Sequence, residues 1–216
     1  MNRADMVTRI RRRLGYNTGL NVNIITDAID DAQNELEELM EKPWFLESEE
    51  ATIECTPDEE RVPVPGNFIS LIPEQDLYVV DGNSVRWPLT PVTTSQLRRT
   101  DKLILSNRVI TGVPQFYALQ GEYFRLYPIP QLNYQLKLIY YKRLIKMAAD
   151  EDENDWAKHS PNCLIGKAGM IITAANGDTD RYIEFEKTYN NAYAALMIAS
   201  EAREHAGMQY VRGGED

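Results

Sequence analysis

The sequence of 216 residues contains few of the residues from which catalytic and metal sites are built. It has two cysteines, Cys55 and Cys163, and two histidines, His159 and His205, and neither pair follows the spacing of a zinc site. Glycine-rich phosphate loops, GxSxG elbows and HExxH sequences are also missing. We therefore expect no metal, no cofactor and no enzymatic activity. We interpret both cysteines as buried free thiols in a reducing compartment.

Long apolar runs and clustered positive charge are missing as well. No stretch approaches the roughly 20 apolar residues of a membrane span, and MNRADMVTRIRRRLGY lacks the apolar core of a signal peptide, so we expect no membrane partner. The 23 Lys and Arg against 33 Asp and Glu give a formal net charge of −10. Such a surface disfavours general binding to a nucleic-acid backbone and would let DNA pass without adhering.

The strongest pattern that is present covers Pro114 to Arg143. Residues alternate in polarity up to a turn at Gly121, alternate again, and pause at Pro128 and Pro130. A further alternating run covers Tyr134–Tyr141. This pattern predicts three consecutive strands of an antiparallel sheet.

Residues 48–113 continue the strand-like pattern. We expect a strand over 51–55, an edge strand in the RVPVP run, and a hairpin that turns on the glycine of Asp81-Gly82-Asn83-Ser84. Thr93 and Gln96 form a capping box for a short helix. Residues 100–113 are expected to form a loop with a strand fragment at 103–105.

Helical spacing occupies both ends of the chain. We expect a helix over 4–15, a second from the cap Asn23 to Lys42, a third from the cap Ser160 to Asn176-Gly177, and a fourth from residue 178 or 179 to Gly207. Small residues in the last two helices indicate close packing of one helix on the other. A flexible acidic linker is expected over 148–155.

Together these elements predict an α+β protein. Residues 1–46 and 147–207 would form one helical bundle, and residues 47–146 an inserted, antiparallel β-rich subdomain. Residues 208–216 would form a C-terminal tail.

Charges of opposite sign lie on the first two predicted helices. The basic residues are Arg9, Arg11, Arg12 and Arg13, and the acidic residues are Asp27, Asp30, Asp31, Glu35, Glu37, Glu38 and Glu41. The carboxylates are predicted to lie opposite the apolar stripe, which favours a solvated face over a metal site. The arginines are open to two interpretations, a solvated face or a contact between subunits.

The central stretch resembles the head-to-tail adaptor proteins of tailed bacteriophages. The resemblance rests on GVPQFY at 112–117, EYFRLYPIP at 122–130 and the Tyr140-Tyr141 pair that closes the next strand. The order of elements over most of the chain is also similar.

The resemblance implies a structural virion protein at the head–tail junction, made in the host cytoplasm. Twelve copies would form a ring below the portal protein, extend the channel for double-stranded DNA, and dock tail or nozzle proteins. The residues that we expect at subunit or portal contacts are Arg9, Arg11, Arg12, Arg13, Asp27, Asp30, Asp31, Glu38, Tyr210 and Arg212. Two alternatives remain open: a carbohydrate- or receptor-binding tail module that uses the tyrosine-rich sheet, and a carboxylate-based cell-wall hydrolase.

Overall fold

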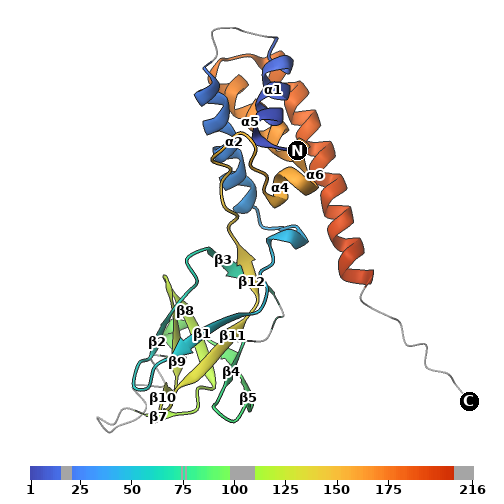
Figure 1. Cartoon of the computed structure of the whole chain (residues 1–216). Coiled ribbons are helices and arrows are strands. Elements are labelled where there is room, and N and C mark those ends of the chain that lie inside the picture. The colour runs from blue at the N-terminus through green and yellow to red at the C-terminus, as the bar shows by residue number, and fades with distance from the viewer. Residues whose placement is uncertain (16–20, 74, 76, 98–109, 207–216) are drawn as a thin grey trace, which may run out of the picture. The chain divides into compact units, whose positions relative to one another are not determined.

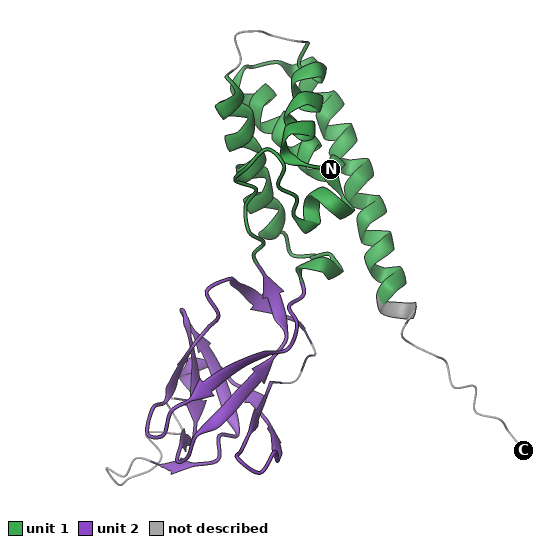
Figure 2. Ribbon diagram, viewed as in Figure 1, with its two compact units in different colours: residues 1–46, 143–216 green, residues 47–142 purple. Residues whose placement is uncertain are grey.

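The structure, a computed structural model, describes residues 1–15, 21–73, 75, 77–97 and 110–206. The chain divides into two compact units: a helical unit of Met1–Leu46 with Arg143–Asp216, and a β unit of Glu47–Lys142 (Figure 2). Helices precede and follow the strands along the chain, which confirms the α+β class. The predicted strand fragment at 103–105 lies outside the described residues.

The helical unit is arranged around helix α5, which contacts α1, α2, α4 and α6 (Figure 1). The described helices are α1 (Arg3–Arg13), α2 (Val22–Glu37), α4 (Asp155–His159), α5 (Pro161–Ala175) and α6 (Thr179–Ala206), with a 3-10 turn at Trp44–Leu46. The first helix follows the prediction closely. Met6, Ile10 and Leu14 are buried, and Gly15 follows the helix with a φ of 78°.

The predicted bounds of the second helix were wrong at both ends. Asn21, not Asn23, is the N-cap: its side chain accepts a hydrogen bond from the backbone N–H of Asn23 at 3.1 Å, so Asn23 already lies inside α2. At the other end, α2 stops at Glu37 instead of Lys42. The chain turns there and brings Phe45 and Leu46 into the core, where they are 7% and 0% exposed.

Residues 148–154 of the predicted acidic linker form a loop, and several of their groups make contacts within the helical unit. The Asp152 carboxylate accepts hydrogen bonds from the backbone N–H groups of Ala148 and Ala149, both at 2.8 Å. The N-terminal ammonium group forms an ion pair with Glu153 at 2.8 Å. The unpredicted helix α4 begins directly afterwards and buries Trp156 completely. These contacts could not be predicted from composition, because acidic residues are equally common in loops that make no such contacts.

Helices α5 and α6 pack very closely at two glycines, as the small residues predicted. A Cβ atom on Gly166 would lie 2.7 Å from the backbone nitrogen of Tyr189, and one on Gly169 would lie 2.1 Å from the ring of Phe185. The small residues of α6 do not share this role, because Ala194 and Ala195 are exposed.

The β unit contains several short sheets, and the chain passes from one sheet to another. The described strands are β1 (Ala51–Cys55), β2 (Arg61–Pro63), β3 (Phe68–Leu71), β4 (Tyr78–Val80), β5 (Arg86–Pro88), β6 (Thr90–Pro91), β7 (Thr111–Gly112), β8 (Phe116–Gln120), β9 (Tyr123–Tyr127), β10 (Ile129–Pro130), β11 (Tyr134–Leu138) and β12 (Tyr140–Lys142). Two sheets have four strands each, in the orders β1-β11-β4-β5 and β2-β9-β8-β6, and the pairs β10-β7 and β12-β3 complete the unit.

The expectation of three consecutive strands in one sheet was wrong. β8 and β9 form the predicted hairpin, with Gly121 at a φ of 60°. β11, however, pairs with β1 and β4 in the other four-stranded sheet. The intervening residues Ile129–Pro130 form β10, which pairs in parallel with β7, and this pair carries the chain from one sheet to the other. The third run also divides into β11 and β12.

Of three local predictions in the β unit, two were confirmed and one was wrong. β2 is an edge strand, as its prolines indicated, and Thr93 and Gln96 form the capping box. The prediction that Gly82 is the special residue of the β4–β5 turn was wrong, because the residue with a positive φ is Ser84, at 64°. The Asp81 carboxylate closes this turn by accepting two backbone N–H bonds.

The tyrosines of the β unit are mainly core residues. Tyr117, Tyr134 and Tyr140 are 8%, 2% and 5% exposed and pack with Phe124 and other apolar side chains. Since these rings are enclosed, they contribute apolar area to the core and do not form a surface platform. The two cysteines are buried free thiols, as predicted, and burial raises the pKa of Cys55 to about 11.

Substitution of Gly166 by alanine tests the packing of α5 on α6. Alanine is the better helix former by about 1 kcal/mol, so a substitution without steric conflict would stabilise the protein. We expect instead a loss of about 1–3 kcal/mol in the free energy of unfolding, because the new methyl group meets the backbone of Tyr189. Chemical denaturation followed by circular dichroism measures it. Gly82→Ala is the control, since its Cβ would have nothing within 4 Å; equal stability of both variants would contradict the close approach.

Candidate functional site: charged and apolar surfaces of the helical unit

The basic residues of α1 lie at its C-terminal end, beside α6. Arg9, Arg12 and Arg13 are exposed, whereas Arg11 is half-buried. A guanidinium nitrogen of Arg13 donates a hydrogen bond to the hydroxyl of Thr188 on α6 at 3.1 Å. This contact places the arginines next to the exposed Lys187 of α6. We call Arg9, Arg12, Arg13 and Lys187 the basic side.

Four carboxylates of α2 form an exposed row at helical spacing. They are Asp27, Asp31, Glu35 and Glu38, and we call them the acidic side. Two of them have partners within the unit: Glu35 pairs with Lys167 at 2.7 Å, and Glu38 lies 3.9 Å from a guanidinium nitrogen of Arg143. The Glu35 and Glu38 side chains nevertheless keep 51% and 66% of their surface exposed, so both remain accessible to another molecule.

Asp30 differs from the rest of the predicted acidic face because it is half-buried. Burial raises its pKa, and the nearby charges of Arg3 and Lys146 act in the opposite direction. Its carboxylate therefore faces positive charge of its own chain. Asp30 is therefore not part of the exposed acidic side.

The prediction that Glu37 belongs to a solvated face was wrong. Its side chain is 2% exposed, and one carboxylate oxygen accepts hydrogen bonds from the Gln33 amide at 2.9 Å and from the backbone N–H of Leu144 at 3.1 Å. Gln33 also donates to the carbonyl oxygen of Leu144 and accepts from Asn154. Burial raises the pKa of Glu37. These bonds hold the segment that returns from the β unit against α2.

The acidic and basic sides lie on different flanks of the unit. α5 contacts both α2 and α6, and in Figure 1 these two helices lie on either side of it. The acidic side follows α2, and the basic side lies where α1 meets α6. A subunit with opposite charges on two flanks can bind a copy of itself head to tail.

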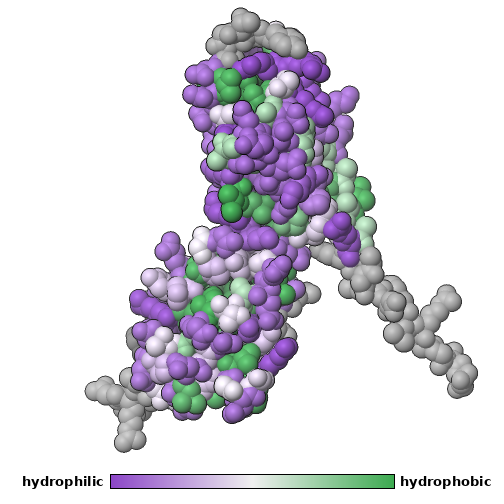
Figure 3. Space-filling view, viewed as in Figure 1, coloured by the Kyte–Doolittle hydropathy of each residue, from purple (hydrophilic) through white to green (hydrophobic). Residues whose placement is uncertain are grey.

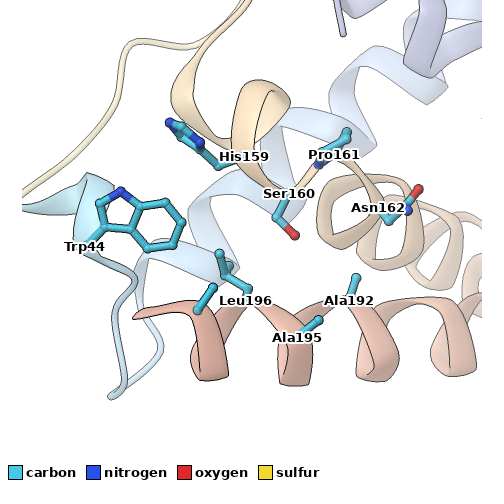
Figure 4. Close-up of a pocket in the computed structure, with 9 residues that line it drawn as sticks. Trp44, His159, Ser160, Pro161, Asn162, Ala192, Ala195 and Leu196 are labelled. Atoms are coloured by element: carbon cyan, nitrogen blue, oxygen red, sulfur yellow. The ribbon is translucent and has the colours of Figure 1, made fainter. Parts of the chain in front are cut away.

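A pocket of about 260 Å³ opens beside the second half of α6. Trp44 and His159 line it on one side, Ala195 and Leu196 of α6 on another, and the start of α5 at Pro161 on a third (Figure 4). The guanidinium group of Arg203 lies 4.1 Å from the centre of the Trp44 ring. The lining also includes the polar residues Ser160 and Asn162, but it contains no carboxylate.

Sequence reasoning missed the exposed side of α6. It assigned the alanines of this helix to internal packing, yet Ala194, Ala195 and Ala199 are exposed, and Ile198 is 67% exposed. The signal that was available is the absence of charge between Lys187 and Glu201, because a solvated helix face normally carries charged residues.

The remaining predictions concern the C-terminal tail, metal sites and membrane spans. Tyr210 and Arg212 lie outside the described residues. Within the part of the chain that the structure describes, no three His, Cys, Asp or Glu side chains are grouped to hold a metal ion, and no helix is long and apolar enough to cross a membrane.

Comparison with known protein families identifies the family of the chain. The family model described as SU10 adaptor protein matches residues 1–212. The chain belongs to the SU10 adaptor protein family. This confirms the resemblance to phage head-to-tail adaptors, and no curated protein matches the chain.

Family membership makes this a structural adaptor protein of a bacteriophage, with a place in the virion. Adaptors of this family interact with portal and tail proteins and associate with copies of themselves. The surfaces of the helical unit are therefore candidate protein-binding sites.

The buried Glu37 predicts a pH dependence of stability. Because its pKa is raised in the folded protein, the folded state binds more protons than the unfolded state as pH rises above the ordinary value of 4.5. Stability conferred by the protonated group is therefore lost as pH rises through the folded pKa. We expect Glu37→Gln to remove this part of the pH dependence and to be at least as stable as wild type at pH 7. Thermal unfolding from pH 4 to 8 measures it.

Glu38→Gln is the matched control for that experiment. Glu38 is adjacent in sequence but exposed, so its neutralisation should leave the pH profile nearly unchanged. A loss of more than about 2 kcal/mol in Glu37→Gln at pH 7 would instead mean that the hydrogen-bond network needs the negative charge.

Proposed function

We propose that this protein forms a ring of twelve copies below the portal at the head–tail junction, extends the DNA channel there, and docks tail or nozzle proteins. The observation that carries the proposal is the family match over residues 1–212. The charged flanks of the helical unit support it, since a ring needs two different, complementary surfaces on each copy.

The contact between copies is proposed to join the basic side of one copy to the acidic side of the next. Complementary charge steers association and fixes which surfaces meet. The net charge of −10 fits a channel component, because an acidic lining repels DNA phosphates and lets the duplex slide.

Imaging of the protein with and without the portal tests the ring. We expect the cognate portal to recruit adaptors into a ring, with added mass equal to twelve copies of the 24.8 kDa chain. Negative-stain electron microscopy and native mass spectrometry read this out. A wild-type protein that never joins the portal would overturn the proposed function.

Charge reversal tests which surfaces meet. We expect Arg9→Glu with Arg12→Glu to weaken assembly at least tenfold, about 1.4 kcal/mol, because both side chains are exposed on the basic side. Arg61→Glu with Arg86→Glu changes the net charge equally but alters the β unit, so it should assemble like wild type. Adaptor bound to the portal is measured by co-sedimentation at low and physiological salt.

Restoring the complementarity should rescue that variant. Adding Asp27→Lys and Asp31→Lys to the double arginine variant exchanges the two signs, and we expect assembly to recover. If the arginine variant assembled like wild type, the arginines would be a solvated face.

The C-terminal tail is proposed to contact the portal or a neighbouring copy through Tyr210 and Arg212. Truncation after Gly207 should then reduce portal binding while leaving the thermal midpoint of the free protein unchanged. Assembly of the truncated chain at wild-type efficiency would remove the tail from the proposed contacts.

A further inference from the structure

The second half of α6 has an exposed, uncharged side that its own unit does not use. No charged residue lies between Lys187 and Glu201, although 26% of the chain is charged. Five exposed residues on this side follow helical spacing, and we call them the α6 seam: Asn191, Ala194, Ala195, Ile198 and Ala202.

The packing of α6 shows that the seam is a separate surface. The buried residues Phe185, Leu196 and Ser200 lie on the opposite side of the helix. In Figure 3 the outer side of this part of α6 has neutral to apolar colouring. An exposed helix face without charge is unusual, because a solvated face normally carries charged and polar residues.

The composition of the α6 seam fits the centre of a protein interface. Interface centres are depleted of charge, and small side chains let another element approach the helix closely. The seam also continues from the basic side, since Lys187 lies one turn before Asn191 and Arg13 bonds to Thr188. An apolar centre beside a charged rim is the usual anatomy of an interface.

The end of α2 and the segment that returns from the β unit offer apolar side chains that fit such a seam. Met40 and Ile145 are 97% and 89% exposed, the highest values among large apolar residues of the described chain. Met40 lies three residues after the end of α2, and Ile145 follows Leu144, which bonds to Glu37 of α2. Both therefore border the acidic side.

Met40 and the α6 seam also lie at a similar level along the helical unit. The hydroxyl of Tyr193 on α6 donates a hydrogen bond to the carbonyl oxygen of Glu41 at 3.2 Å. Met40, the neighbour of Glu41, is thus level with Ala194 in the α6 seam. Copies placed flank to flank without a shift would bring these residues together.

We propose that the α6 seam of one copy packs against the α2 flank of a second copy, where Met40 and Ile145 provide the apolar contacts. The same contact places the basic side against the acidic side, so charge complementarity selects a second copy as the partner. The pairing rests on the proposed function, because it requires copies arranged head to tail.

A charged substitution in the seam tests the pairing. Ile198→Asp should reduce assembly on the portal at least tenfold, while its thermal midpoint stays at the wild-type value because the side chain is 67% exposed. Leu132→Asp is the matched control: it alters a large apolar residue that is 59% exposed but belongs to the β unit, and so to neither the seam nor the two charged sides. Assembly of Ile198→Asp at the wild-type level would overturn the pairing and leave the proposed function standing.

A photo-activated cross-linker at position 198 identifies what covers the seam. In portal-bound assemblies of the full chain, we expect a cross-link between two copies that maps by mass spectrometry to the peptides containing Met40 or Ile145. A cross-link to the portal or to a tail protein, or none at all, would overturn the pairing. A wild-type protein that formed no ring would overturn both proposals.

Discussion

Helix α6 can lie against α5 only because α5 has no side chain at two positions. At Gly166 and Gly169 the backbone and ring of α6 occupy the space that a methyl group would need. This approach makes α5 the centre of the unit, in contact with α1, α2, α4 and α6. It also determines which side of α6 faces outward. The positions of the charged flanks and of the α6 seam follow from this one packing constraint.

A second constraint arises because the helical unit is made from two separate parts of the chain. The returning segment must find its place on α2 after the whole β unit, and buried polar groups specify that place. Glu37 binds the backbone of Leu144, which is 107 residues away in sequence. A buried carboxylate that loses a hydrogen-bond donor is costly, and a shifted register would remove the Leu144 donor from Glu37. The network thus gives up some stability at neutral pH in exchange for a defined arrangement.

Most of the helices, the β8–β9 hairpin and the capping box could be predicted because their signals are local in sequence. Period, capping residues and turn glycines act over a few residues. The errors concern contacts between distant segments. The alternation in β11 gives the face of each side chain but not the partner strand, which proved to be β1 and β4 instead of β9. Glu37 resembles its exposed neighbours in sequence, and only the arrival of Leu144 makes it an interior residue. The seam on α6 was overlooked because alanines suit both an internal and an external helix contact.

The charge of the chain makes the apolar surface important for assembly. Copies that each carry a net charge of −10 repel one another at long range. Complementary flanks overcome this repulsion only at short distance, because salt screens charges beyond about 8 Å at physiological ionic strength. Rim charges mainly govern the rate and specificity of association. An uncharged seam contributes free energy that salt does not screen. In the proposed pairing, charged flanks select the partner, and the exposed side of α6 supplies the affinity that a protein this acidic needs in order to bind itself.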